Sequence, residues 1–250
     1  VDAGLLAICE GKFSGTRASL GVSFARQEYG HWGVAARLKA TQPHRGVARQ
    51  WFRSPDILAL LPFNQPDPVA SYGLVWSVPQ ARAEHLLALS PEAFEQELQD
   101  AIVQSDASAP AKVGQLSLTS PVAAWPLALA QASRWTGPGW VLLGDAAHLV
   151  HPLAGQGLNL GLADVDTLVS VLKQARGDEP WRSPGDERTL RRYARQREWP
   201  TKAMSGLTDG LLHLFADERS PVRDLRNAGM SLVQRLGPVK NWLIGRALDT

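Results

Sequence analysis

The sequence predicts a mixed α/β fold of the α+β kind. An apolar run at 140–143 ends at Gly144 and Asp145 and leads into a glycine-rich turn and a helix, a pattern typical of the carboxyl edge of an open α/β sheet, where ligands bind. Short strand-like runs separated by Pro, Asn, Asp and Gly fill 32–77, which favours an antiparallel sheet. Helical patterns dominate after residue 187.

The elements of the first half follow in chain order. A short apolar strand is predicted at 5–9. The expected strands of the antiparallel sheet are 32–40, 46–52, 58–63 and 72–77. Two helices are predicted after them, at 79–88 and 91–104. The second helix places four apolar residues on one face, namely Phe94, Leu98, Ala101 and Ile102.

The second half begins with a return to strands within 112–129, followed by the buried strand at 140–143. A helix follows the glycine-rich turn. The stretch 174–186 is rich in Pro, Gly and charged residues and is predicted to be a loop. A long helical region follows it.

Composition limits the class of protein. Of the 250 residues, 44% are hydrophobic and 20% are charged, which is ordinary for a folded globular chain. The 26 basic and 24 acidic residues leave a net charge of +2, which argues against a nucleic-acid partner. The single cysteine excludes an intrachain disulfide, and no run reaches the roughly 18 apolar residues of a membrane span. We therefore expect cytoplasmic residence.

The glycine-rich turn after Asp145 has the chemistry of a ligand site. The first amides of the helix behind it have no acceptor within the helix, so they are available to a negative or carbonyl oxygen. The carboxylate of Asp145 suits sugar hydroxyls. We expect no metal here, because His148 and His151 are the only candidate ligands and Pro152 interrupts any helix between them and the turn. His148 is expected to pack and hydrogen-bond rather than to act as a base.

The run GDAAHLVHPLAGQGLNLG at 144–161 resembles the second FAD-binding motif of the class A flavoprotein aromatic hydroxylases, and within them of the ubiquinone-biosynthesis hydroxylases. The resemblance implies a glutathione-reductase-like FAD-binding domain. It implies that Asp145 binds the ribityl chain and that the turn lies against the pyrimidine edge of the isoalloxazine. The cofactor-binding residues so predicted are Gly144, Asp145, Pro152, Gly155, Gln156, Gly157, Leu158 and Asn159.

A second resemblance lies at 9–17, CEGKFSGTR, which is similar to the A-D-G-x-x-S-x-x-R motif of the same family. Glu10 stands where the family has Asp, which keeps the charge and lengthens the side chain. Ser14 is placed to cap a short helix. The resemblance implies that Arg17 lies near the FAD phosphates, since a guanidinium binds phosphate with paired donors.

Further resemblances suggest the domain organisation. Residues 57–79 are similar to the substrate-domain sheet of the family, and 189–197 and 210–215 to its C-terminal signatures. They imply an antiparallel-sheet substrate domain inserted into the FAD-binding domain, and a helical C-terminal region. The expected boundaries are 1–22 and 120–175 for the FAD-binding domain, 23–119 for the substrate domain and 176–250 for the helical region.

The family's first glycine-rich FAD motif, G-x-G-x-x-G after a strand, does not occur in this chain. We therefore expect a chain that is truncated at its N-terminus and lacks the ADP-binding half. Such a chain alone is expected to bind FAD poorly and to be inactive.

The resemblance implies an FAD-dependent monooxygenase that uses NAD(P)H and O2 to hydroxylate the aromatic ring of a polyprenylated phenol in ubiquinone biosynthesis. No residue is predicted to be catalytic, because the cofactor performs the difficult chemistry. Two alternatives stay open. One is a flavin hydroxylase of a soluble aromatic compound, and the other is a non-catalytic scaffold that retains the fold.

The C-terminal stretch 222–247 is basic and carries apolar residues in an amphipathic context. Such a stretch either lies peripherally on an anionic membrane, here the inner membrane, or packs on the protein through its apolar residues. Membrane contact would suit a prenylated substrate, and other quinone-biosynthesis proteins are further candidate partners.

Overall fold

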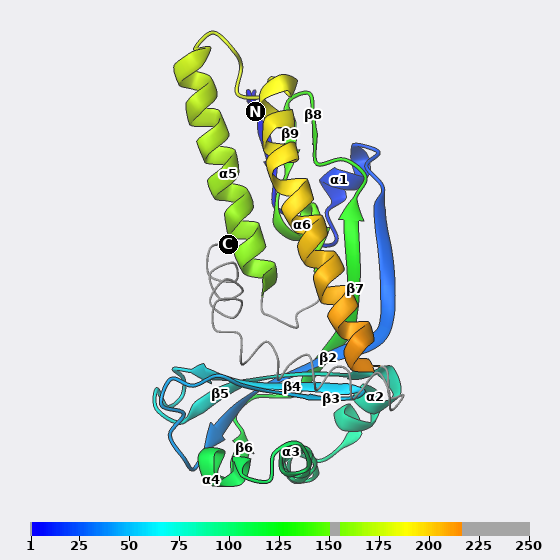
Figure 1. Cartoon of the computed structure of the whole chain (residues 1–250), viewed down its shortest axis with the longest axis vertical. Helices are drawn as coiled ribbons and strands as arrows, with labels where there is room; N and C mark the ends of the chain where they lie inside the picture. Colours follow the sequence, from blue (N-terminus) through cyan, green and yellow to red (C-terminus); the bar gives the residue numbers. More distant parts are fainter. Residues whose placement is uncertain (1, 151–155, 217–250) are drawn as a thin grey trace. The chain divides into compact units, whose positions relative to one another are not determined.

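The computed structural model describes residues 2–150 and 156–216. These residues separate into two compact units, each described here by itself (Figure 1). The first unit comprises 2–27, 128–150 and 156–213, and the second unit comprises Glu28–Leu127. The predicted mixed α/β fold with an antiparallel sheet is confirmed.

The second unit is built on the antiparallel sheet. Its strands, in chain order, are β2 (Phe24–Ala40, which starts in the first unit), β3 (Arg49–Arg53), β4 (Asp56–Phe63), β5 (Ser71–Pro79), β6 (Leu116–Leu118) and the start of β7 (Ala123–Ala132). Strands β2, β5, β4 and β3 are neighbours in that order, and β6 pairs with β2. All four strands expected between 32 and 77 are confirmed. Alternation along β4 and β5 buries Leu58, Leu60, Leu74 and Trp76 in one core.

Three helices lie on one face of this sheet, α2 (Gln80–Ala88), α3 (Pro91–Ser105) and α4 (Ala109–Val113) (Figure 1). Helix α3 begins where it does because the Ser90 hydroxyl accepts the Ala93 amide and Pro91 occupies the first turn. The apolar face predicted for α3 is buried in the core.

One expected strand region starts later than predicted. Residues Lys112 and Val113, expected at the start of a strand, belong to α4. Pro110 favours a helix start, and Gly114, at φ +73°, ends that helix. Strand β6 therefore begins only at Leu116.

The first unit contains a three-stranded sheet in the order β1 (Leu6–Ile8), β9 (Trp140–Leu142), β8 (Thr136–Gly137). Strands β1 and β9 are parallel, with Ile8 opposite Leu142. The short 3₁₀ helix η1 (Gly144–Ala146) follows β9, and β10 (His148–Leu149) pairs with the end of β7. Both predicted strands, at 5–9 and 140–143, are confirmed.

Helices α1 (Gly15–Ser19), α5 (Gln156–Asp178) and α6 (Glu187–Ala216) complete the first unit, and the two long helices lie side by side (Figure 1). The predicted loop at 174–186 is shorter than expected, because α5 continues to Asp178. The side chain of Ala175 is buried, and the packing of this last part of α5 outweighs the low helix preference of the charged and glycine residues that follow it. The amphipathic stretch 222–247 lies outside the described residues. Within the described ranges, no helix combines the length and the apolar character that a membrane crossing requires.

Candidate flavin site

Two segments far apart in the chain meet at the carboxyl edge of the sheet in the first unit. Strands β1 and β9 are parallel, so their carboxyl ends lie at the same edge. The segment 9–17 follows β1, and η1 follows β9. The Nη1 atom of Arg17 donates to the carbonyl oxygen of Ala146 over 2.8 Å and so joins the two segments directly. The segment 9–17 and the turn at 144–146, which two separate motifs indicated, are therefore in direct contact.

Glu10 organises the first of these segments. Its carboxylate accepts hydrogen bonds from the Ser14 hydroxyl at 2.6 Å, the Thr16 hydroxyl at 2.6 Å and the Thr16 amide at 3.1 Å. The hydroxyl of Ser14 in turn accepts the Arg17 amide and caps α1, as predicted. The hydrogen bonds from Ser14 and Thr16 hold the pKa of Glu10 below its usual value. The longer side chain of Glu10 therefore stabilises the start of α1 through these hydrogen bonds.

Arg17 is buried rather than extended towards solvent. Besides Ala146, its guanidinium donates to the carbonyl oxygen of Lys12 at 3.0 Å and lies 3.7 Å from the ring centre of Phe24. Two of its donors are thus occupied by backbone oxygens. In this arrangement Arg17 fixes the position of η1, and its contact with FAD phosphates stays a prediction.

The turn after β9 presents a carboxylate without a protein partner. Gly144 has a φ of +56°, a left-handed conformation that glycine adopts without a steric penalty. Asp145 is exposed and forms no hydrogen bond or ion pair with residues 2–150 or 156–216, although its neighbours Ala146 and Ala147 are buried. A carboxylate held this way by its backbone is available to accept hydrogen bonds from a ligand.

The start of α5 supplies donors near the same turn. Gln156, Gly157, Leu158 and Asn159 form its first turn, which contains no acidic residue. The amides of Gln156, Gly157 and Leu158 come before the first amide that has an acceptor within the helix, and the helix dipole favours negative charge there. The predicted site residues Pro152 and Gly155 lie outside the described residues. Of the predicted set, the structure therefore brings η1, Arg17 and the start of α5 to one end of the first unit.

Helix α5 and η1 approach each other at backbone level. A Cβ atom added to Gly161 would lie 3.4 Å from the Cα atom of Gly144, and one added to Gly144 would lie 3.7 Å from the Cα atom of Gly161. Glycine at both positions lets the helix approach the turn closely. Gly161, the last glycine of the motif, therefore allows close packing of α5 on η1.

A buried network that sequence reasoning missed lies beneath the turn. Asp164, on α5, is fully buried. Its Oδ2 atom accepts the Gly144 amide at 2.9 Å and faces Nε2 of His148 at 2.7 Å, and its Oδ1 atom accepts Nε of Arg197 at 2.8 Å. His148 also stacks on Trp135, with ring centres 4.9 Å apart. This agrees with the packing and hydrogen-bonding role expected of His148.

The charge state of Asp164 follows from these contacts. Burial by itself raises the pKa of this carboxyl, but the hydrogen bonds and charges of His148 and Arg197 and the Gly144 amide together hold it below its ordinary value. An ionised carboxylate only accepts, so Nε2 of His148 is the donor in this pair. The sequence did contain a signal, since Asp164 ends the motif G-L-N-L-G-L-A-D, but it gave no partner for it.

The donors and acceptors of this edge fit a flavin. The unpartnered Asp145 carboxylate can accept from the hydroxyls of the ribityl chain, and the first amides of α5 can donate to the N1 and C2 carbonyl edge of the ring system. We find no cluster of three metal-ligating side chains in the described part of the chain.

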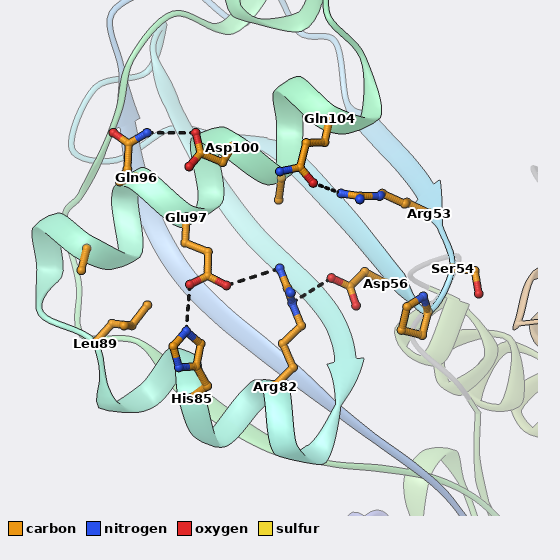
Figure 2. A pocket seen from close by; sticks show the side chains of 13 residues that line it. Arg53, Ser54, Asp56, Arg82, His85, Leu89, Gln96, Glu97, Asp100 and Gln104 are labelled. Atoms are coloured by element: carbon orange, nitrogen blue, oxygen red, sulfur yellow. Dashed lines mark hydrogen bonds and ion pairs between the residues drawn. The ribbon is translucent and has the colours of Figure 1, made fainter.

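A second polar region lies in the second unit, in a pocket of about 630 Å³ between α2, α3 and the β3–β4 turn. Figure 2 shows Arg82 between the carboxylates of Asp56 and Glu97, with His85 on the other oxygen of Glu97. Each charged group in this set contacts another of opposite sign. Within the described residues, however, the Oδ1 atom of Asp56 and the Nε atom of Arg82 are buried without a hydrogen bond.

Comparison with known proteins indicates an FAD-binding family. Residues 1–205 match a family model described as an FAD binding domain. The ubiquinone hydroxylase UbiL of Rhodospirillum rubrum is 31% identical over 250 residues, which are 100% of this chain and 55% of that protein. The ubiquinone biosynthesis monooxygenase COQ6 of Rattus norvegicus is 30% identical over 270 residues, 97% of this chain and 56% of that protein. The chain thus spans about half the length of these relatives.

Among solved structures, the chain is similar to PqsL of Pseudomonas aeruginosa, described as a probable FAD-dependent monooxygenase. The TM-score is 0.68 at 22% identity, over 88% of this chain and 59% of that one. This likeness confirms the predicted FAD-binding fold. Since the family model covers most of its length, the chain belongs to the FAD binding domain family.

Proposed function

We propose that this chain forms the flavin-facing and substrate-facing part of an FAD-dependent monooxygenase that hydroxylates the aromatic ring of a polyprenylated phenol in ubiquinone biosynthesis. NAD(P)H is the proposed reductant and O2 the oxidant. The observation that carries the proposal is the exposed carboxylate of Asp145, which has no polar partner among residues 2–150 and 156–216 and lies at the carboxyl edge of parallel strands, on the turn that contacts α5 at Gly161. The names of the relatives support the substrate class.

In this proposal the chain's residues bind and orient. Asp145 accepts hydrogen bonds from ribityl hydroxyls, and Gly144, with its positive φ, sets the direction of the carboxylate. The amides of Gln156, Gly157, Leu158 and Asn159 face the pyrimidine edge, and Pro152 and Gly155 belong to the same proposed turn. Bound FAD supplies the reductive activation of O2. The protein positions the ring and excludes water from it.

The domain boundaries at 22, 119 and 175 and the C-terminal helical region remain part of the proposal. So do cytoplasmic residence and a peripheral contact at the inner membrane, which would give access to a prenylated phenol. The absence of a spanning helix among the described residues carries no further conclusion.

The test is a titration with FAD of the protein that contains this chain, followed by quenching of flavin fluorescence. Asp145→Asn is expected to raise the dissociation constant at least about tenfold, since a hydrogen bond to a charged group contributes about 1.5–3 kcal/mol. The matched control is Asp166→Asn, which changes an exposed carboxylate on α5. Equal affinities of the parent chain and Asp145→Asn would contradict the proposed site.

The substrate class has its own test. NAD(P)H oxidation with product analysis is compared for prenylated phenols and for soluble aromatic acids, in the protein that contains this chain. Hydroxylation of the prenylated phenol is expected. Hydroxylation of the soluble acid alone would support the alternative hydroxylase, and the absence of flavin binding would support the scaffold.

A further inference from the structure

Asp164 connects four elements of the first unit with one carboxylate. Its own helix is α5, and its three partners belong to η1, β10 and α6. Arg197 also donates from Nη2 to the carbonyl oxygen of Leu160 at 3.1 Å, which fixes the guanidinium beside the carboxylate. A shift of any one of these elements would break at least one of the contacts.

An ionised carboxylate fits these contacts, because it can accept from all three partners at once. Gly144 and Arg197 can only donate, and the hydrogen bond with His148 shares the oxygen that Gly144 uses. An amide side chain at position 164 would place its NH2 group against one of these donors. The contacts therefore depend on the charge of Asp164 and not only on its shape.

The hydrogen bond from Gly144 bears directly on Asp145. Gly144 immediately precedes Asp145, and its amide is held on Oδ2 of Asp164. Asp145 itself has no polar partner in the described part of the chain, so its place is set by the backbone of η1. The glycine contact between α5 and η1 limits how close they come, and the amide–carboxylate bond prevents them from separating.

We propose that Asp164 is a positioning residue, whose buried carboxylate holds the turn at Gly144 against α5 and thereby aims the carboxylate of Asp145 at its ligand. Its ligand is the flavin only if the proposed function is correct, and the positioning itself does not depend on that. Arg197 keeps the carboxylate ionised and oriented. The proposal concerns residues of this chain and needs no bound group to be tested.

The decisive experiment measures amide hydrogen exchange in the chain without ligand, residue by residue by NMR. In Asp164→Asn the Gly144 amide is expected to exchange at least about tenfold faster, with smaller increases at neighbouring amides of η1, while amides of β4 and β5 keep their rates. Asp166→Asn is the matched control and is expected to leave all these rates unchanged. An unchanged Gly144 rate in Asp164→Asn, or an equal increase throughout the chain, would overturn the proposal.

If Asp164→Asn does not fold, Arg197→Gln takes its place. This change keeps a donor near Oδ1 and removes the positive charge. A several-fold faster Gly144 exchange, with β4 and β5 unchanged, is the expected result, and an unchanged rate would overturn the proposal.

A second measurement tests the link to Asp145 through the dissociation constant for FAD. The single variants Asp145→Asn and Asp164→Asn are compared with the double variant. Because Asp164 acts through Asp145, the double variant is expected to bind FAD about as weakly as Asp145→Asn alone. A double variant that shows the product of the two separate fold-changes would overturn that link. A parent protein without FAD affinity, measured in the protein that contains this chain, would refute the proposed function, while the exchange result would still decide the positioning role.

Discussion

Asp164 in the first unit and Asp56 in the second unit are both carboxylates paired with an arginine, yet their surroundings differ. Asp164 is fully buried, and each of its oxygens accepts from a well-aligned donor. Asp56 is partly exposed. Its Oδ2 atom lies 3.0 Å from Nε of Arg82, but that N–H is not directed at the carboxylate, and its Oδ1 atom is buried without a hydrogen bond. The contact with Arg82 is therefore an ion pair without hydrogen-bond geometry.

The two pKa shifts follow from this difference. Burial dominates at Asp56, and the charge of Arg82 offsets it incompletely, so the pKa of Asp56 is raised. At Asp164 the three donors outweigh burial, so its pKa is lowered. A buried carboxylate is thus stabilised in its charged form only where enough donors converge on it. We therefore expect the contacts of Asp164 to hold the turn at Gly144 in position, and those of Asp56 to contribute only to packing and less to stability.

The largest expected effect is that of Asp164→Asn on stability. Removing one partner of a buried ion pair leaves the others uncompensated, at a loss of about 3–5 kcal/mol. We expect a loss in this range for the free energy of unfolding of the first unit, measured by amide hydrogen exchange of its strands and helices as a function of urea concentration. Asp166→Asn should stay within about 0.5 kcal/mol of the parent chain. A loss below about 1 kcal/mol for Asp164→Asn would remove the distinction between the two networks.

The next effect is that of Gly144→Ala. An alanine at φ +56° is strained by about 1–2 kcal/mol, because its Cβ crowds the following carbonyl. We expect a loss of this size, together with weaker FAD binding from a displaced Asp145. Gly46→Ala is a control for strain alone, since Gly46 has φ +71° and belongs to the second unit. It should lose comparable stability and leave the FAD affinity unchanged, and equal loss of affinity in both variants would contradict the account.

A smaller effect is expected for Asp56→Asn. The charged form of Asp56 is disfavoured by burial and its partner Arg82 is more than one-third exposed, so the expected change in unfolding free energy is below about 1 kcal/mol at neutral pH. The same exchange measurement, made on the strands and helices of the second unit, determines it. A loss as large as that of Asp164→Asn would show that the network in Figure 2 is as strongly coupled as the buried one.

The two carboxylates should also differ in the sign of their pH dependence. The pKa of Asp164 is lowered, so its contribution to stability is present above the unfolded value of about 3.9 and is lost as the pH falls below it. The pKa of Asp56 is raised, so its contribution is present below about 3.9 and is lost as the pH rises through the folded pKa. The stability difference between parent and variant should therefore grow as the pH rises towards about 3.9 for Asp164→Asn. For Asp56→Asn it should shrink above about 4. Parallel trends for both would contradict these assignments.

Local patterns predicted much of the fold. The strands at 140–143 and between 32 and 77, and helix α3 with its Ser90 cap, depend on periodicity and turn residues that are close in sequence. The end of α5 at Asp178 was not predicted, because burial of Ala175 is a tertiary effect. The same holds for the contact of Arg17 with Ala146, which joins residues 129 positions apart.

The candidate site was predicted in part. The motifs selected Gly144, Asp145 and the start of α5, and the structure brings them to one end of the first unit. They did not reveal that Asp164 bonds His148 and Arg197. Helical spacing from the buried Leu160 and Leu168 places Asp164, unlike Asp166, on the buried face of α5, but spacing within one helix does not identify partners on β10 and α6. The packing of α6 against α5 supplies Arg197, which together with His148 and the Gly144 amide stabilises the charged form of the buried Asp164.

The most direct test of the central claim is an experimental structure, with FAD bound, of the protein that contains this chain. The account predicts a carboxylate oxygen of Asp145 within about 3 Å of a ribityl hydroxyl, a normal hydrogen-bond distance, with the first amides of α5 facing the pyrimidine edge of the flavin. A flavin bound elsewhere, with Asp145 still directed only to solvent, would contradict it.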